Sequence, residues 1–92
     1  MEFEWDESKA KANLTKHGVS FEEAKTVFDN VLAVIFDDEA HSVGERREII
    51  IGHSRNNCLL LISFTERSNI IRIISARLAT RREREDYEQN AF

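Results

Sequence analysis

The first polar and apolar positions along the chain have the spacing of an α-helix. Asp6 is a typical N-cap, and the segment after it places Ala10, Leu14 and His17 on one face, at i, i+4 and i+7. Gly18 is a typical residue for ending a helix, since it adopts the left-handed conformation without strain. The pattern predicts a first helix from Asp6 to about His17.

A second helix follows immediately. Residues 20–23, "SFEE", match a capping box, in which a Ser hydroxyl and a Glu carboxylate satisfy free amides at a helix start. Apolar side chains then recur at helical spacing at Phe21, Ala24, Val27 and Phe28. We expect both helices to pack on a common surface and to cover one side of a sheet.

The middle of the chain is rich in branched apolar residues, separated by turns of Asp, Gly, Asn and Ser. Short connections imply antiparallel neighbours. Residues 58–62 are apolar on both faces, as are 70–74 apart from Arg72, so these strands need a second cover from the final helix or a partner. The expected strands are 31–36, 47–52, 57–65 and 69–76, with 2–5 as a candidate for a short extra strand.

A last helix is expected after Thr80, which forms another capping box with Glu83. Its apolar side chains are few, with Leu78, Ala79 and Tyr87 near it, so we expect it to be mobile or held by a partner. The prediction is one α+β domain over 1–92, with two N-terminal helices packed on a mostly antiparallel four-stranded sheet and a C-terminal helix.

The charge of the chain is unevenly distributed. The net charge is −4, which argues weakly against nucleic acid as a partner. Residues 1–45 hold four Lys, no Arg and eleven acids, for a net −7, whereas residues 46–92 hold nine Arg and six acids, for a net +3. Because the planar guanidinium fork suits phosphate, we expect an anionic ligand to bind to the second half.

Cysteine usage and the N-terminus indicate the compartment. Cys58 is the only cysteine, so no disulfide within the chain and no cysteine-based zinc cluster is expected. The opening "MEFEWDESK" is acidic and unlike a signal peptide, and no stretch approaches the roughly 20 apolar residues that span a bilayer. We expect a cytoplasmic protein.

Several ordered motifs resemble one family over nearly the whole chain. They are "FEWDESKAKANLTKHGVSFEEAKTVF", a segment with Asp38, His41, Glu45 and Arg47, then "IGHS", "TERSNIIRIISARLAT" and a final "ER…YE". Together they resemble BrnT, the toxin of a type II toxin–antitoxin pair. The chain departs from the usual pattern of that family at Asn30, where proline is frequent, and at the turn residues Asn57 and Ser68, where glycine is frequent.

The resemblance implies a RelE-like fold, ribonuclease activity on cellular RNA and neutralisation by a BrnA-type antitoxin that also binds operator DNA. This chain would therefore be linked to operator DNA only through the antitoxin. No cofactor is expected. We interpret Asn57 and Ser68 as replacements for glycine within the same turns, because Asn is tolerated where the backbone has a positive φ.

A metal-independent ribonuclease must deprotonate a 2′-hydroxyl, neutralise the charge that grows on phosphorus and protonate the leaving oxygen. By resemblance to RelE-like enzymes, attention falls on Arg77, Arg81 and Tyr87. Arg77 follows Ile71, Ile73 and Ser75 in phase, so it either contacts phosphate or anchors a helix carboxylate. Arg81 lies in a mixed run that is usually a solvated face, and Tyr87 is equally a core anchor.

Five further residues join the expected catalytic and binding sets. Glu66 and Arg67 lie where two strands join, either as a proton acceptor with a phosphate ligand or as a turn ion pair. His17 is a candidate acid or base, although a helix-end role explains it too. The catalytic set is Arg77, Tyr87, Glu66, Arg67 and His17, and the RNA-binding set is Arg81, Arg47 and Lys16.

Two other interpretations stay open. The arginines could serve a non-catalytic module that binds a partner or an anion, or the fold could persist without activity. His41 and His53, even with Asp38 or Glu45, lack the spacing of metal ligands, so no metal site is expected.

Overall fold

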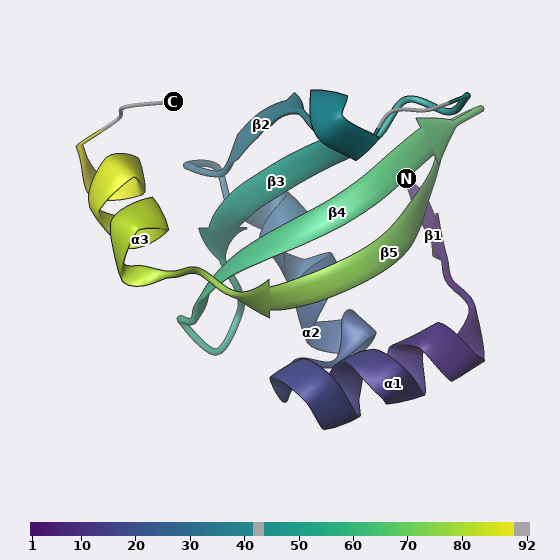
Figure 1. Ribbon diagram of the computed structural model, residues 1–92, viewed down its shortest axis with the longest axis horizontal. Helices are drawn as coiled ribbons and strands as arrows, with labels where there is room; N and C mark the ends of the chain where they lie inside the picture. The colour runs from purple at the N-terminus through teal and green to yellow at the C-terminus, as the bar shows by residue number, and fades with distance from the viewer. Residues whose placement is uncertain (42–43, 90–92) are drawn as a thin grey trace.

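The computed structural model describes residues 1–41 and 44–89 (Figure 1). The strands are β1 (Glu2–Glu4), β2 (Val34–Asp37), β3 (Glu48–His53), β4 (Leu59–Arg67) and β5 (Ile70–Leu78). The helices are α1 (Glu7–His17), α2 (Phe21–Thr26) and α3 (Arg81–Glu88), with short 3-10 turns at Val27–Asp29 and Glu39–His41. None of the helices in these described residues is long and apolar enough to cross a membrane.

The sheet has five strands in the order β1-β5-β4-β3-β2. Strands β2 to β5 pair antiparallel, as predicted, whereas β1 pairs parallel with β5 and places Phe3 opposite Ile71. The candidate strand at 2–5 is thus confirmed as β1, and the four-stranded description is corrected to a mixed five-stranded sheet. A parallel pair needs a long crossover, and here nearly the whole domain separates β1 from β5.

Strand boundaries also shift from those expected. Val31 and Leu32 lie in a turn before β2 and are 94% and 72% exposed, because Ala33 N donates to Asn30 O and closes that turn. The turns between β3, β4 and β5 hold Asn57 and Ser68 at φ 60° and 54°. The prediction that these two residues serve turns that favour glycine is confirmed.

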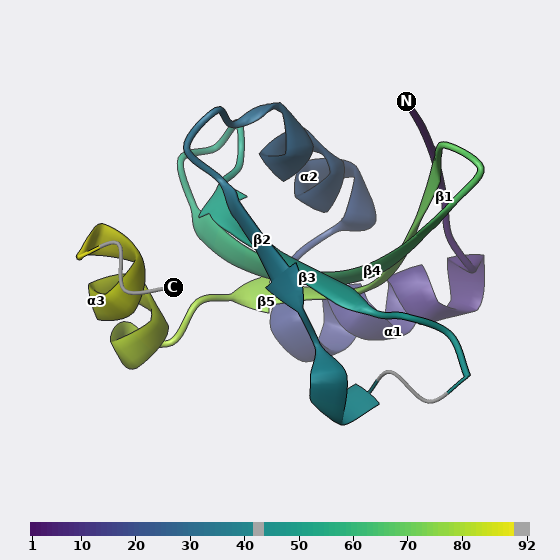
Figure 2. The same ribbon diagram turned by 90° about the horizontal axis from the view of Figure 1, so that it is seen from above.

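Helices α1 and α2 take different places around the sheet. In Figures 1 and 2, α2 lies over one face of the sheet, whereas α1 runs along its edge at β5. The expectation that both helices cover one face is corrected accordingly. We call the face under α2 the core face and the opposite one, which faces the viewer in Figure 1, the open face.

The apolar core lies between α2 and the core face of the sheet. T-shaped ring contacts join Phe28 to Phe64 at 5.1 Å and to Phe3 at 5.2 Å between centroids. Burying an apolar side chain of this size stabilises the fold by about 1.5–3 kcal/mol. The buried members include Val19, Phe21, Ala24, Val27, Ile50, Leu60, Ile62, Phe64, Ile71, Ile73 and Ala76.

Helix α1 is capped as predicted but buries a different side chain. The Asp6 carboxylate accepts from the amides of Ser8 and Lys9, and Gly18 ends the helix at φ 69°. Leu14, expected on the packed face, is 51% exposed, whereas Asn13 is only 7% exposed. Ala10 packs against the core as expected, so the predicted face is corrected only at Leu14, in place of which α1 buries the amide of Asn13.

Asn13 binds the edge of β5 beyond the end of β1. Its Nδ2 donates to Ala76 O at 2.8 Å and to Val19 O at 2.9 Å, and its Oδ1 accepts from Ala76 N at 3.1 Å. Strand β1 pairs with β5 only at residues 70–72. The Asn13 side chain therefore supplies the hydrogen bonds to the backbone of Ala76 that a neighbouring strand would otherwise make. Buried backbone groups need such partners.

The start of α2 shows half of the predicted capping box. Ser20 Oγ accepts from Glu23 N at 3.0 Å, as expected. The Glu23 carboxylate instead accepts from Ser54 Oγ, at 2.7 Å, and so ties α2 to the loop after β3. The reciprocal half of the motif is lost because a tertiary partner takes the carboxylate.

Candidate active site

The open face carries Arg77 near the end of β5. Leu61 of β4 lies opposite Arg77, but the register shifts between Ser63, which faces Ser75, and Phe64, which faces Ile73. Residue 74 is therefore an extra residue, a β-bulge. Arg77 was predicted to share a face with Ile71 and Ile73. Because the bulge reverses the alternation, it lies on the opposite face of the sheet instead.

Arg77 forms a bidentate ion pair with Glu83 in the first turn of α3. Its Nη1 donates to Glu83 Oε1 at 2.8 Å and to Leu78 O at 3.2 Å, and its Nη2 donates to Glu83 Oε2 at 2.9 Å. Glu83 is in place because Thr80 caps α3: Thr80 Oγ1 accepts from Glu83 N, and Thr80 N donates to Glu83 Oε1. The predicted capping box of α3 is confirmed.

The ion pair shifts the ionisation of both partners. Hydrogen bonds from Arg77 lower the pKa of Glu83 to about 2, helped by the amide of Thr80. The same bonds raise the pKa of Arg77 above its ordinary value. Both groups therefore stay charged across the physiological pH range, and the guanidinium is held in one orientation beside α3.

Tyr87 and His53 meet one turn further along α3, since Tyr87 follows Glu83 by four residues. The Tyr87 hydroxyl donates to Leu32 O at 2.8 Å, and its ring contacts His53 edge-on, with 5.8 Å between centroids. His53 is the last residue of β3 and lies on the open face, since Ile51, two residues earlier, pairs with Leu61. Sequence reasoning set His53 aside, although its period-two alternation with Ile51 was a readable signal.

These contacts attach α3 at the end of the sheet. In Figures 1 and 2 the helix stands beyond the end of β5 and does not lie over β4 and β5. It is held at its start by Glu83 and near its end by Tyr87. Of the two covers expected for the second face of the central strands, the final helix or a partner, α3 is thus not the one that lies over it in this structure.

Between β3 and α2, a recess of about 410 Å³ adjoins His53. His53 therefore lines a concave surface as well as contacting Tyr87. A flat base or a ribose would meet both polar and charged groups there. The recess is lined by Thr26, Asp29, Asn30, His53, Ser54 and Arg55.

Glu66 and Arg67 lie far from Arg77. Arg67 is six residues beyond Leu61 on β4, a separation of about 20 Å along a strand. Glu66 alternates with Arg67 and so projects toward the other face of the sheet, opposite Ile71. The expected convergence of these residues with Arg77 is therefore corrected, and Arg67 belongs to a separate recess with Arg72.

The remaining expected residues are dispersed. Arg81 is 92% exposed and pairs with Glu85 at 3.2 Å within α3, which is the solvated-face interpretation. Arg47 precedes β3, and its carbonyl accepts from Asp38 N. Lys16 and His17 end α1, and in the described part of the chain neither bonds to Arg77 or Tyr87.

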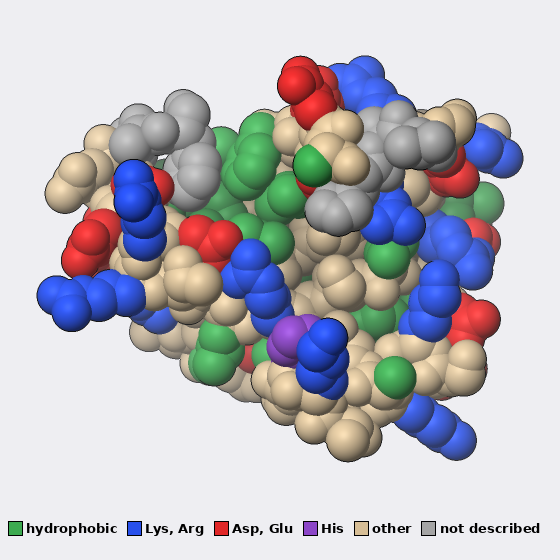
Figure 3. All heavy atoms as spheres, viewed as in Figure 1, with side chains coloured by type: hydrophobic (Ala, Val, Ile, Leu, Met, Phe, Trp, Pro, Cys, Tyr) green, Lys and Arg blue, Asp and Glu red, His purple; other side chains and the backbone are tan. Residues whose placement is uncertain are grey.

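Basic side chains are distributed over the open face as a whole. Figure 3 shows Lys and Arg from α3 across to the far end of the sheet, mixed with hydrophobic and acidic groups. Among the described residues, no group of three His, Cys, Asp or Glu side chains is placed to hold a metal ion. The side chain of His41 lies outside what the structure describes.

The fold and this site define a small α+β domain with a cationic sheet face and an ion-paired C-terminal helix. The family model of the ribonuclease toxin BrnT, of type II toxin–antitoxin systems, matches residues 5–83. The chain belongs to this family, and the prediction made from its motifs is confirmed. It is thus a member of a ribonuclease toxin family.

A solved structure agrees with this assignment. The fold is similar to the 1.1 Å crystal structure of the Brucella abortus ribonuclease toxin BrnT, with a TM-score of 0.67 and 25% identity. The match covers 88% of this chain and 99% of that one. No protein in the curated set matches the chain.

Proposed function

We propose that this chain cleaves RNA by attack of a ribose 2′-hydroxyl on the neighbouring phosphorus, at the corner formed by Arg77, His53 and Tyr87. The observation that supports it is that Arg77 contacts α3 through Glu83, and His53 contacts the next turn of α3 through Tyr87, both at the end of the sheet where α3 attaches. We call this set the α3 corner. Family membership supplies the reaction class, and the corner supplies groups that fit it.

In this reaction the 2′-oxygen forms a bond to phosphorus while the bond to the 5′-oxygen breaks. The products are a 2′,3′-cyclic phosphate and a 5′-hydroxyl end. One proton leaves the attacking hydroxyl and one reaches the departing oxygen. An imidazole performs both transfers near neutral pH, so His53 is our candidate for them, with Tyr87 positioning its ring.

Arg77 would stabilise the negative charge that develops on the phosphorane oxygens. A guanidinium has five N–H donors, and within the described residues three of those on Arg77 are engaged by Glu83 and Leu78. Two donors therefore remain for phosphate. Donors already oriented before the reaction are effective because they need no reorganisation.

The corner uses protein groups alone for charge and proton transfer, so the proposed mechanism is metal-independent. Of the other expected residues, His17, Glu66 and Arg67 lie outside the corner and carry no role in this chemistry. Arg81, Arg47 and Lys16 remain candidates for contacts with the RNA backbone. The distances along β4 and β5 support this division.

The expected partners are RNA and an antitoxin of the BrnA type, with operator DNA bound only through that antitoxin. Inhibition would follow if the antitoxin covers the α3 corner or displaces α3. The three apolar side chains exposed beside it, Val31, Leu32 and Leu78, would suit such a contact.

The test compares wild type with Arg77→Ala and a matched control, Arg46→Ala. Arg46 is also an ion-paired arginine, with Asp37 at 2.7 Å, but lies outside the corner. We expect wild type to cleave RNA in the presence of a chelator and to leave cyclic or 3′-phosphate ends. Loss of one transition-state donor should lower kcat about 100-fold or more in Arg77→Ala.

The outcomes separate the hypotheses. Full activity in Arg77→Ala would reject the assignment of this residue, and intact RNA with measurable binding would favour the non-catalytic module. Thermal unfolding of each variant shows whether the loss comes from the fold. Growth arrest on expression without an antitoxin is a second, cheaper measurement of the same activity.

A further inference from the structure

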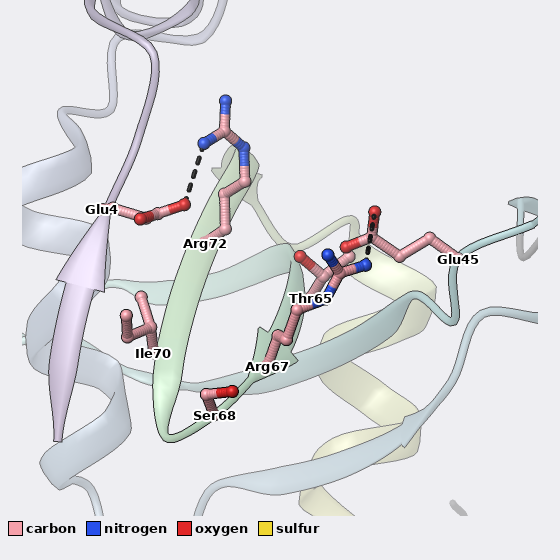
Figure 4. A pocket seen from close by; sticks show the side chains of 7 residues that line it. All are labelled: Glu4, Glu45, Thr65, Arg67, Ser68, Ile70 and Arg72. Carbon is pink, nitrogen blue, oxygen red and sulfur yellow. Dashed lines mark hydrogen bonds and ion pairs between the residues drawn. The ribbon is translucent and has the colours of Figure 1, made fainter.

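A second recess lies on the open face at the hairpin that joins β4 and β5 (Figure 4). Its volume is about 370 Å³. Figure 4 shows Arg67 directed toward Glu45 and Arg72 directed toward Glu4. The lining residues are Glu4, Glu45, Thr65, Arg67, Ser68, Ile70 and Arg72.

Both arginines of the recess keep donors available. The Arg67 Nη2 lies 3.9 Å from Glu45 Oε2, beyond hydrogen-bond distance, so charge alone joins them. Arg72 donates one hydrogen bond, from Nη1 to Glu4 at 2.9 Å. All four side chains are about half or more exposed, and ion pairs this exposed are weak. An anion can therefore displace the carboxylates.

The recess shares the open face with the α3 corner. Arg72 pairs with Thr65, and Arg77 pairs with Leu61, four residues away on β4 and thus about 13 Å along the strand. Arg67 is about 20 Å from Leu61 by the same measure. Ser63 and Ser75, a pair of small polar residues, lie between the two sites.

We propose that this recess binds a second phosphate of the RNA strand through Arg67 and Arg72, away from the bond that is cleaved. This inference rests on the proposed function, because the same strand must cross the α3 corner. A single strand spans 13–20 Å with a few nucleotides, within the roughly 4–16 nucleotides that small β-domains bind. The neutral stretch at Ser63 and Ser75 lets the backbone pass between the sites.

Two features favour a phosphate as the ligand. Arg67 and Arg72 both line the recess together with the Thr65 and Ser68 hydroxyls, and guanidinium and hydroxyl donors suit phosphate oxygens. The recess lies about 13–20 Å from Arg77 along the strand, a distance that a polymer with regularly repeated phosphates can span with two of its charges. Arg67, first predicted to be catalytic, is assigned here as a substrate-positioning residue. Arg72 has the same role, although the sequence analysis noted it only as a charged residue within an apolar strand.

The experiment measures binding of non-cleavable 2′-O-methyl RNA to the full chain by fluorescence anisotropy. A long oligonucleotide of about 12 residues reaches both sites, whereas a dinucleotide, which has a single phosphodiester, occupies only one of them. For Arg67→Ala/Arg72→Ala we expect a Kd about tenfold higher with the long RNA only. The slope of log K against log salt should become shallower by about 0.7, the value for the loss of one phosphate contact on a single strand.

The matched control is Arg82→Ala/Arg84→Ala, which removes the same charge from α3 and should change Kd less than about twofold. The double variant could unfold because it loses the contact of Arg72 to β1. The single variant Arg67→Ala is therefore measured as well, since the ion pair of Arg67 with Glu45 has no hydrogen bond to lose. An unchanged Kd for long RNA, or an equal loss in the control, would overturn the inference.

Cleavage by wild type is measured in parallel so that the two proposals fail separately. If wild type leaves RNA intact while the arginine variants still lose affinity for the long RNA, the proposed function fails and the subsite stands. If wild type cleaves and the variants bind as well as it does, the subsite fails alone.

Discussion

Asn13 offers a direct test of how the edge of the sheet is completed. The substitution Asn13→Leu keeps the size of the side chain but removes its three hydrogen bonds to Ala76 and Val19. One amide and two carbonyls would then lose a partner at a buried site. Water cannot replace the side chain, which is only 7% exposed.

The expected loss follows from these three groups. An unsatisfied buried donor or acceptor costs about 1–3 kcal/mol, and the added apolar burial of Leu offsets about 1 kcal/mol. For three groups we therefore expect a loss of about 2–8 kcal/mol in the free energy of unfolding. Domains of this size have roughly 5–14 kcal/mol in total, so Tm should fall by at least about 10 °C.

The assay is urea unfolding followed by circular dichroism, with Leu14→Ala as the control. Leu14 is the next residue and is 51% exposed, so its truncation should cost less than about 1 kcal/mol. The structure thus predicts that the polar residue matters more than its apolar neighbour. A larger loss for Leu14→Ala than for Asn13→Leu would refute the reasoning.

Two further predictions concern Glu83 and Gly52. The pKa of Glu83 is lowered to about 2 from 4.5, so its stabilisation is present above pH 4.5 and is lost as the pH falls toward 2. In urea unfolding, the difference between wild type and Glu83→Gln should be about 1 kcal/mol at pH 6, allowing for solvent screening, and less than half of that at pH 3; a constant difference would contradict this. A Cβ at Gly52 would lie 2.7 Å from Ala33 Cβ, so Gly52→Ala should lower the free energy of unfolding by about 1–3 kcal/mol. Adding Ala33→Gly should recover part of that loss, and no recovery would contradict the contact.

The capping signals were readable from sequence because they involve residues within four positions of each other. Asp6, Gly18 and the Thr80–Glu83 box perform the predicted local roles. Ser20 does so too, but its partner Glu23 bonds to Ser54 from another element. Local chemistry thus predicted where helices begin and end, whereas the choice among competing partners depended on tertiary contacts.

The candidate site was predictable only in part. Arg77 and Tyr87 could be singled out by resemblance, and Arg77 anchoring a helix carboxylate was one of the two roles weighed for it; the bond to Glu83 shows that anchor. The meeting of Tyr87 with His53 could not be predicted, because it depends on where α3 docks after the sheet has formed. The distance between Arg67 and Arg77 also depended on pairing, because the register of β4 and β5 places Arg67 six residues along β4 from Leu61, the partner of Arg77.

From its residues alone, this chain could be assigned its helices, its four longer strands and its family, since periodicity, caps and ordered motifs are properties of short segments. Which side chains share a face was decided by the fold. One extra residue at position 74 moves Arg77 to the open face, and the end of β1 leaves an edge that Asn13 must bind. Register and edges arise from pairing between distant segments, and alternation within one strand carries no record of them.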